Sequence, residues 1–460
     1  MKNKRFRIMT IFLLVLLFAS CSNKEENIET GPKSVDELIN NIDNIAKKPD
    51  TTEKASSKEE VKEDRSEAKK NWEKSLAKNK DNEEKKEKPK KKILNFEDED
   101  NEEYSKKARI KFFGDTMAHF EQVQYALNYG GGEYDFSNQF SYISDYVKDA
   151  DLSITNYETT TNPNREYAGY PAFNTPGVYL KNIKDAGFDV VTTANNHTLD
   201  TDEEGVFSTI DAIENAGLDY VGTHKDDGER ILYKDVNGIK VAILSYTYGC
   251  NGKVDLLTVR DEVDYVNYIH DDLIKEDIKE AKDKGADFVI VYPHWEIEYE
   301  SYPIQETVER GHDMIDWGAD LVIGNHPHVV QPVEKYTTDD GREGLIAYAL
   351  GNFVSMQSLE SFGDARVEQS LSIDLNIELD EKTGKKKISN IKYNPLWVGT
   401  TYDEYGASVK TYRCEDFLEG GDKYDLVDEN QRARIKQAYD MTMETVNTEV
   451  SEWIFLTNTK

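Results

Sequence analysis

The sequence predicts an α/β domain over residues 104–460, with a second β-sheet packed on the first. Three observations support this class. Short apolar runs of strand character alternate with segments of helical period. Most of the helical segments end at a glycine, the usual C-terminal signal of a helix. After residue 329 strands predominate, which indicates that the second sheet is built late in the chain.

The predicted elements follow in chain order. Early strands are expected at residues 109–113, 152–155, 188–193, 239–246, 287–292 and 320–323, because each is an apolar run. Helices are expected at 178–186, 204–216, 270–284 and 304–317, each followed by a glycine, and at 429–448. Later strands are expected at 329–336, 344–349, 369–379 and 386–393. Asn237-Gly238 supplies a hairpin turn that leads into residues 239–246.

The first 21 residues predict a lipoprotein signal peptide. Four basic residues precede a run of 12 mostly apolar residues, 8–19, which at about 1.5 Å per residue is too short for a bilayer core of roughly 30 Å. Phe18-Ala19-Ser20-Cys21 resembles a bacterial lipobox, so we expect Cys21 to become a lipidated N-terminus. Acyl chains such as palmitate would hold the protein on the extracytoplasmic face of the cell membrane. The alternative is ordinary secretion with cleavage nearby.

Residues 22–103 predict a disordered, charged tether. They carry 19 basic and 24 acidic residues, with one tryptophan and one phenylalanine. Such a segment buries too little apolar surface to offset the entropy of ordering. Residues 34–48 begin with a capping box and have one apolar helical face. They predict either a transient helix within the spacer or a helix that contacts the membrane or the domain.

Most of the negative charge lies on the predicted domain. Residues 104–460 carry 34 basic and 65 acidic residues, a net charge of −31. A field of that sign repels phosphate backbones and argues against nucleic-acid binding, and equally against a simple electrostatic clamp on an acidic polymer. Three cysteines are too few for a disulfide scaffold or a Cys-rich zinc domain. Cys250 and Cys414 either pair in an oxidising compartment or remain buried thiols.

Polar residues follow five of the predicted strands, and the carboxyl ends of strands are where ligands bind in open α/β sheets. The side chains that stand there in chain order are Asp115, Glu158, Asn196, His197, His294, His326 and His328. Carboxylates and imidazoles suit Mn²⁺, Fe²⁺ or Zn²⁺. Two such ions roughly 3.5–4 Å apart, bridged by a carboxylate, could clamp a phosphoryl oxygen and activate a water.

Each of these residues alone also has a structural interpretation. Asp115 could cap the helix that follows it, Asn195 or Asn196 could be a turn residue, and His294 could be a hydrogen-bonded core histidine. Their order along five strand ends favours a divalent metal site.

The same stretches carry a family resemblance over roughly residues 108–355. The matching motifs are Gly114-Asp115-Thr116-Met117, Asn156-Tyr157-Glu158, Ala194-Asn195-Asn196-His197 with Asp200, Gly217 to Gly222, His294-Trp295, Gly324-Asn325-His326-Pro327-His328 and Gly351-Asn352-Phe353. Their order resembles the calcineurin-like metallophosphatases and, more closely, the CapA family of poly-γ-glutamate capsule biosynthesis proteins. The resemblance implies a metallophosphatase-like sandwich of two sheets flanked by helices, with residues 356–460 adding C-terminal strands and a helix.

The resemblance also implies roles for individual residues. Asp115, Glu158 and His328 would hold one ion, and a second group would hold the other. That second group is Glu158, Asn196, His294 and His326. His197 would stand near the substrate and act as general acid. Asp200 would either orient His197 or cap the following helix, and the capping role is favoured.

Two departures from the family pattern concern the metal site. Metallophosphatases usually have a histidine where this chain has Met117, a poor ligand for a hard ion, although the CapA family resembles this chain in lacking it. His119 either reaches back to the site or is a partly exposed histidine at a helix start. Glu296 stands where the family often has glycine, and it either joins the site or points to solvent.

The expected function follows from the resemblance and the export signal. We expect a lipid-anchored, extracytoplasmic protein that acts in capsule, poly-γ-glutamate or other cell-envelope polymer biosynthesis, with a metal-dependent, phosphoesterase-type hydrolase site. Whether it is an enzyme stays open at this stage. Expected partners are the cell membrane, a membrane polymer synthase complex, and an anionic surface polymer or phosphoester substrate. The alternative is a non-catalytic lipoprotein scaffold or polymer-handling partner of a membrane synthase, which the loss of a ligand at Met117 favours.

Overall fold

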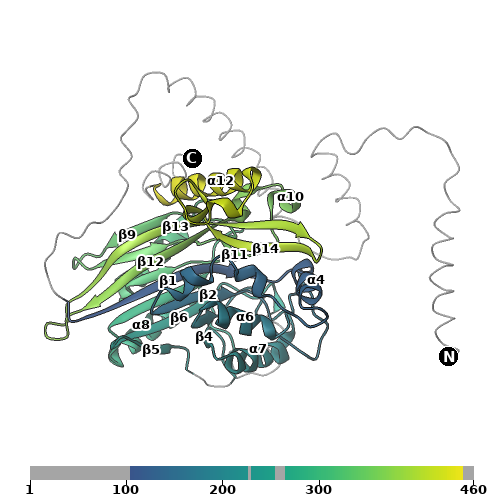
Figure 1. Ribbon diagram of the computed structural model, residues 1–460. Helices are drawn as coiled ribbons and strands as arrows, with labels where there is room; N and C mark the ends of the chain where they lie inside the picture. Colours follow the sequence, from purple (N-terminus) through teal and green to yellow (C-terminus); the bar gives the residue numbers. More distant parts are fainter. Residues whose placement is uncertain (1–103, 226–228, 254–264, 449–460) are drawn as a thin grey trace, which may run out of the picture. The chain divides into compact units, whose positions relative to one another are not determined.

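The computed structural model describes residues 104–225, 229–253 and 265–448 (Figure 1). The export signal, the tether and the helix expected at residues 34–48 lie outside these residues and remain predictions. Within the described part of the chain, no helix combines the length and apolar character needed to cross a membrane.

Two β-sheets form the centre of the domain. The first has eight strands in the order β14-β13-β12-β1-β2-β3-β4, with β11 also paired to β1; the second has six in the order β5-β6-β7-β8-β10-β9. The first sheet comprises β1 (Lys106–Thr116), β2 (Leu152–Tyr157), β3 (Val190–Thr192), β4 (Asp219–Val221), β11 (Asn352–Val354), β12 (Gln369–Leu379), β13 (Lys386–Asp403) and β14 (Gly406–Arg413). The second comprises β5 (Leu232–Val236), β6 (Ile239–Thr247), β7 (Phe288–His294), β8 (Leu321–Ile323), β9 (Val333–Thr337) and β10 (Glu343–Ala347).

Helices connect the parallel strands and cover the sheets (Figure 1). They are α4 (Phe120–Tyr129), α5 (Ser144–Lys148), α6 (Val178–Ala186), α7 (Asp202–Ala216), α8 (Asp271–Asp283), α9 (Gln305–Trp317), α10 (Leu359–Phe362), α11 (Cys414–Phe417) and α12 (Glu429–Val446). Short 3₁₀ turns lie at Ser137–Phe140, Ala365–Glu368 and Tyr424–Leu426.

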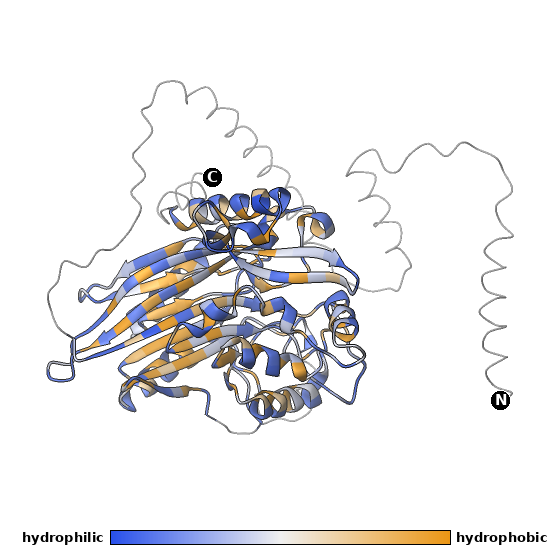
Figure 2. Ribbon diagram, in the orientation of Figure 1, coloured by the Kyte–Doolittle hydropathy of each residue, from blue (hydrophilic) through white to orange (hydrophobic). Residues whose placement is uncertain are grey.

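Three apolar clusters account for the layers. The first contains side chains of both sheets, such as Ile110 and Ile154 from one and Ile243 and Ile290 from the other, so it lies between them. The second joins the first sheet to α6, and the third joins the second sheet to α8 and α9. Figure 2 shows hydrophobic residues along the strands of both sheets. The predicted class, α/β with two sheets flanked by helices, is therefore confirmed.

The prediction that the second sheet is built late in the chain is wrong. The second sheet comes from the middle of the chain, while β12, β13 and β14 return to the first sheet, where β12 pairs antiparallel with β1. Leu371, Ile373 and Leu375 alternate with polar residues in β12, and this alternation does not specify which sheet the strand joins. The open edge of β1 offers unpaired backbone groups, and β12 satisfies them.

The alternative of two buried thiols is the correct one for the cysteines of the domain. Cys250 and Cys414 are both buried, and no disulfide joins them. They lie in separate apolar clusters, Cys250 near Leu199 and Val206, and Cys414 near α12.

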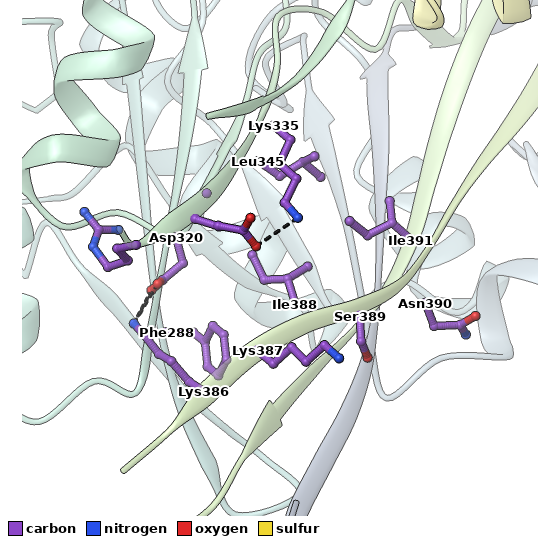
Figure 3. Close-up of a pocket in the computed structure, with 13 residues that line it drawn as sticks. Phe288, Asp320, Lys335, Leu345, Lys386, Lys387, Ile388, Ser389, Asn390 and Ile391 are labelled. Carbon is purple, nitrogen blue, oxygen red and sulfur yellow. Dashed lines mark hydrogen bonds and ion pairs between the residues drawn. The ribbon is translucent and has the colours of Figure 1, made fainter. Parts of the chain in front are cut away.

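A small cavity of about 180 Å³ opens at the amino ends of β7 and β8, beside the start of β13 (Figure 3). Two ion pairs line it. Lys386 of the first sheet lies 2.6 Å from Asp320 of the second, and Lys335 lies 2.8 Å from Glu343. The Lys386–Asp320 pair therefore ties the two sheets together at the end opposite to the polar strand ends.

Candidate metal centre

The polar residues predicted at the strand ends converge in the structure. Asp115 is near the end of β1, Glu158 directly follows β2, and His294 ends β7. His326 and His328 lie in the loop after β8, and Asn196 and His197 lie in the loop after β3. All seven side chains are buried. Because both sheets direct the carboxyl ends of their parallel strands to this region, residues far apart in sequence meet here.

Five of these residues form two groups that share one carboxylate. Asp115, Glu158 and His328 form the first group; Glu158, His294 and His326 form the second, and within each group the ligand atoms lie within 4.8 Å of one another. Glu158 Oε1 lies 3.6 Å from His294 Nε2 and 3.8 Å from His328 Nε2. Glu158 thus stands where a bridging ligand between two ions would stand.

Asn196 joins the second group through its amide oxygen. Asn196 Oδ1 lies 2.8 Å from His294 Nε2, the same ring nitrogen that faces Glu158. An amide oxygen and an imidazole nitrogen directed at one point are suitable ligands for a divalent ion.

The chemistry of the buried groups fits a cation. Among the described residues, the two carboxylate oxygens of Glu158 have no hydrogen-bond partner. The same is true of His326 Nδ1. Burial and the neighbouring Asp115 raise the pKa of Glu158 well above its usual value. Burial, with the adjacent imidazoles, lowers the pKa values of His294 and His326, which favours neutral rings. Buried acceptors without partners are costly, and a bound cation would compensate them.

The loop that carries two of the imidazoles has an unusual backbone. His326 and His328 adopt φ angles of 104° and 58°, in the left-handed region that non-glycine residues rarely occupy. The backbone N–H of His326 donates to Asp115 Oδ2 at 3.3 Å, which fixes the loop against β1. Strain of this kind persists where the surroundings hold it in place, and it is common at functional sites.

His197 belongs to neither ligand group and is held by Asp200. His197 Nδ1 lies 2.7 Å from Asp200 Oδ2. Asp200 also accepts the backbone N–H of Phe173 and the ammonium of Lys253, both at 2.7 Å. The favoured expectation that Asp200 caps the following helix is wrong, because its carboxylate is directed at His197 and Thr201 occupies the N-cap position of α7.

The positions that depart from the family pattern do not add ligands. Met117 is buried, and His119 is the N-cap residue of α4, with Nε2 3.2 Å from Ser355 Oγ. Glu296 accepts the backbone N–H of Ile304 at 2.9 Å, just ahead of α9. Glu296 is half-buried and belongs to neither ligand group, so of its two alternatives the one that joins the site does not hold.

Two asparagines in the centre were not singled out as site residues from the sequence. Asn156 Nδ2 donates to Asp115 Oδ1 at 2.8 Å and lies 3.4 Å from His294 Nδ1, so it contacts one ligand of each group. Asn352 Oδ1 lies 2.9 Å from His328 Nδ1 and holds that ring. Asn156 lies near the end of β2 and Asn352 begins β11, and their place within the quoted motifs was the available signal.

Comparison with known proteins places the chain in a family. The protein-family model described as bacterial capsule synthesis protein PGA_cap matches residues 109–357. The capsule biosynthesis protein CapA of Bacillus anthracis is 33% identical over 266 residues, covering 56% of this chain and 62% of that protein. The PGA biosynthesis protein CapA of Bacillus subtilis (strain 168) is 30% identical over 236 residues, covering 50% of this chain and 60% of that protein. The chain thus spans less than two thirds of either relative's length.

Among solved structures, the chain is similar to the calcineurin-like phosphoesterase YfkN from Bacillus subtilis. The identity is 15%, the TM-score is 0.37, and the similarity covers 74% of this chain and 100% of that one. The family model matches more than half of the sequence. This chain belongs to the bacterial capsule synthesis protein PGA_cap family.

Proposed function

We propose that this protein acts in the synthesis of a capsule, of poly-γ-glutamate or of another cell-envelope polymer, through a two-metal hydrolase site of the phosphoesterase type. Membership of the PGA_cap family supports the biological role, as do two relatives named for capsule and PGA biosynthesis. One geometric observation carries the chemical role. Glu158 is fully buried between two ligand groups, and its carboxylate has no hydrogen-bond partner among the described residues.

The ligand assignment uses the two groups that share Glu158. Asp115, Glu158 and His328 would hold one ion, and Glu158, Asn196, His294 and His326 would hold the other. Manganese, iron or zinc suits these oxygen and nitrogen donors. When bound, two such ions would polarise a phosphoryl oxygen and activate a water for attack.

The remaining chemistry belongs to side chains of this protein. His197 would give a proton to the leaving group as general acid. Asp200 Oδ2 would accept a hydrogen bond from His197 Nδ1. The other ring nitrogen, Nε2, is therefore the one that would transfer the proton. Asn156 hydrogen-bonds to Asp115, and Asn352 hydrogen-bonds to His328. Such hydrogen bonds to metal ligands would keep the ligands in position.

The location is proposed from the N-terminal sequence. Lipidation at Cys21 would hold the protein on the extracytoplasmic face of the membrane, and a tether of about 80 residues would let the domain reach tens of ångströms from its anchor. A membrane polymer synthase complex is the proposed partner. Because the domain carries a net charge of −31, contact with an anionic polymer would have to be made through the metal ions.

A second candidate function is a scaffold that handles polymer without catalysis. The buried Met117 at a position where metallophosphatases usually have a ligand favours it. In this case the ligand groups would bind an ion for structure, and His197 would have no chemical role.

Gene deletion followed by complementation separates these functions. The surface polymer would be quantified in the deleted strain and after return of the wild-type chain, His197→Ala or the control Tyr402→Ala, at equal protein levels. The hydrolase proposal expects polymer of altered amount or chain length in the deleted strain, restored by wild type and Tyr402→Ala but not by His197→Ala. The scaffold function expects restoration by all three. An unchanged polymer after deletion would contradict both.

A further inference from the structure

Aromatic rings contact three imidazoles of the site. The ring of Tyr248 lies 4.8 Å from that of His326, measured between centroids, and the ring of Tyr299 lies 5.8 Å from that of His328. Phe173 meets His197 edge-on at 4.7 Å. These rings come from three separate segments, after β6, after β7 and ahead of α6. The metal centre is therefore bordered by aromatic side chains on several sides.

Several of these rings are open to solvent or continue into exposed rings. Tyr248 is 50% exposed. Phe362 packs on Tyr299 at 4.4 Å and is 44% exposed, and Tyr170 lies 6.4 Å from Phe173 and is 76% exposed. We call Tyr170, Phe173, Tyr248, Tyr299 and Phe362 the aromatic collar. Single exposed rings are ordinary, but exposed rings gathered beside one buried polar site mark a binding surface.

Hydrogen bonds hold the collar in place. The backbone N–H of Tyr299 donates to Pro327 O at 2.8 Å, and its φ is 66°. Gln357 Nε2 donates to the Tyr299 hydroxyl at 3.2 Å. The backbone N–H of Tyr248 donates to His294 O at 3.1 Å. Tyr248 and Tyr299 are thus fastened to the ligand-bearing loops, and rings held in advance lose little freedom on binding a ligand.

Charge narrows the choice of ligand. Glu298 is exposed and directly precedes Tyr299 in the chain. The collar therefore includes a negative group on a domain whose net charge is −31. Both an anionic polymer and an anionic membrane surface would be repelled here. The part of the ligand that contacts the collar must be neutral, with apolar faces.

We infer that the collar binds sugar rings, so that the substrate carries pyranose units next to the bond acted on at the metal centre. A pyranose ring presents C–H groups on its faces, and these pack on the electron-rich faces of aromatic rings. Its hydroxyls provide donors for Glu298. The contact of Tyr248 and Tyr299 with His326 and His328 places a stacked sugar beside the metal ligands, as expected for substrate rather than for a protein partner. This inference rests on the proposed function and names its substrate class, a glycan.

Isothermal titration calorimetry on the full chain in detergent tests the inference. The probes are neutral tetrasaccharides of N-acetylglucosamine, glucose and galactose, with poly-γ-glutamate and anionic phospholipid vesicles as competitors of other classes. Wild type is expected to bind at least one tetrasaccharide saturably. Tyr248→Ala and Phe362→Ala are each expected to weaken binding about fivefold. Tyr402→Ala, an 81% exposed tyrosine on the β13–β14 hairpin, is the matched control and should change nothing.

The inference is overturned if none of the three tetrasaccharides binds, if Tyr402→Ala weakens binding as much as the collar variants do, or if only poly-γ-glutamate or vesicles bind through the collar. Thermal melting of each variant checks that it is folded. Each titration is run with and without chelator, because stacking on the collar does not require metal. Sugar binding by a protein that holds no metal even before chelator is added would contradict the proposed two-metal site and would leave sugar binding by the collar standing. A protein that binds two metal ions but no sugar would contradict this inference and keep the proposed function.

Discussion

Replacing Glu158 by glutamine is expected to change stability in opposite directions with and without metal. The substitution keeps the shape of the side chain and removes its charge. In the metal-free protein, Glu158 is a buried carboxylate without a hydrogen-bond partner among the described residues, and burial raises its pKa well above 4.5. The metal-free variant should therefore be at least as stable as metal-free wild type at pH 7. In the metal-loaded protein, the variant should be less stable, because both ligand groups lose their shared member.

The direction in which stability changes with pH follows from the sign of the Glu158 pKa shift. A raised folded-state pKa means that the folded protein holds the Glu158 proton more tightly than the unfolded chain does. This contribution to stability is fully present below pH 4.5 and is lost as the pH rises towards the folded-state pKa, at about 1.4 kcal/mol per pH unit. Metal binding stabilises the folded protein. It adds about 2.7 kcal/mol to the free energy of unfolding for each site when the free metal concentration is a hundred times Kd.

Thermal melting of wild type and Glu158→Gln, from pH 4 to 8, with chelator or with Mn²⁺, measures both effects. One kcal/mol corresponds to roughly 2–4 °C in Tm for a domain of this kind. Glu296→Gln is the matched control, since its carboxylate caps α9 and lies outside both ligand groups. The control should lose the same stability in chelator and in Mn²⁺. Equal responses of Glu158→Gln and wild type to Mn²⁺ would refute the bridging role of Glu158.

Three further predictions address other parts of the account. His197→Ala should lower kcat for a phosphodiester about 10²–10⁴-fold with metal content unchanged, and loss of metal in this variant would contradict its separate role. Cys21→Ala should move the protein from the membrane to the soluble extracytoplasmic fraction on cell fractionation, and continued membrane association would refute lipid anchoring there. Asp277→Asn should lower the free energy of unfolding, measured in urea, by about 2–3 kcal/mol, because the buried Asp277 carboxylate accepts hydrogen bonds from Arg230 and the Tyr246 hydroxyl. A change within about 0.5 kcal/mol would show that this ion pair is dispensable.

Local patterns predicted some elements well. The helix expected at residues 178–186 is α6, Val178–Ala186, which ends at Gly187 with a left-handed φ of 111°. A glycine after an apolar helical stripe is enough to set that boundary. By contrast, β1 begins at Lys106, three residues before the expected start. Its first residues are charged, and they become a strand because they pair with β12.

Two elements were not delimited from the sequence. The α4 helix begins after His119, which is not one of the preferred N-cap residues. The β14 strand, Gly406–Arg413, has little apolar alternation and is formed by pairing with β13. The sequence anticipated a helix start near His119 without giving the helix its bounds, and no local signal identified β14.

The candidate site was more predictable than the topology. Strand ends in an α/β domain lie at one edge of the sheet, so the chain order of polar residues predicted which of them would meet. The orientation of single side chains was not predictable in this way. Asp200 turns to His197 because the Phe173 backbone N–H and Lys253 also donate to it. These groups are distant from Asp200 in sequence, so only the fold reveals them.

Metal content tests the central claim most directly. The full chain would be purified in detergent without chelator, incubated with Mn²⁺, Fe²⁺ or Zn²⁺, desalted and analysed by elemental mass spectrometry. The two ligand groups that share Glu158 predict about two ions per chain in wild type and fewer in Glu158→Gln. A wild-type protein that retains no ion with any of the three metals would contradict the account.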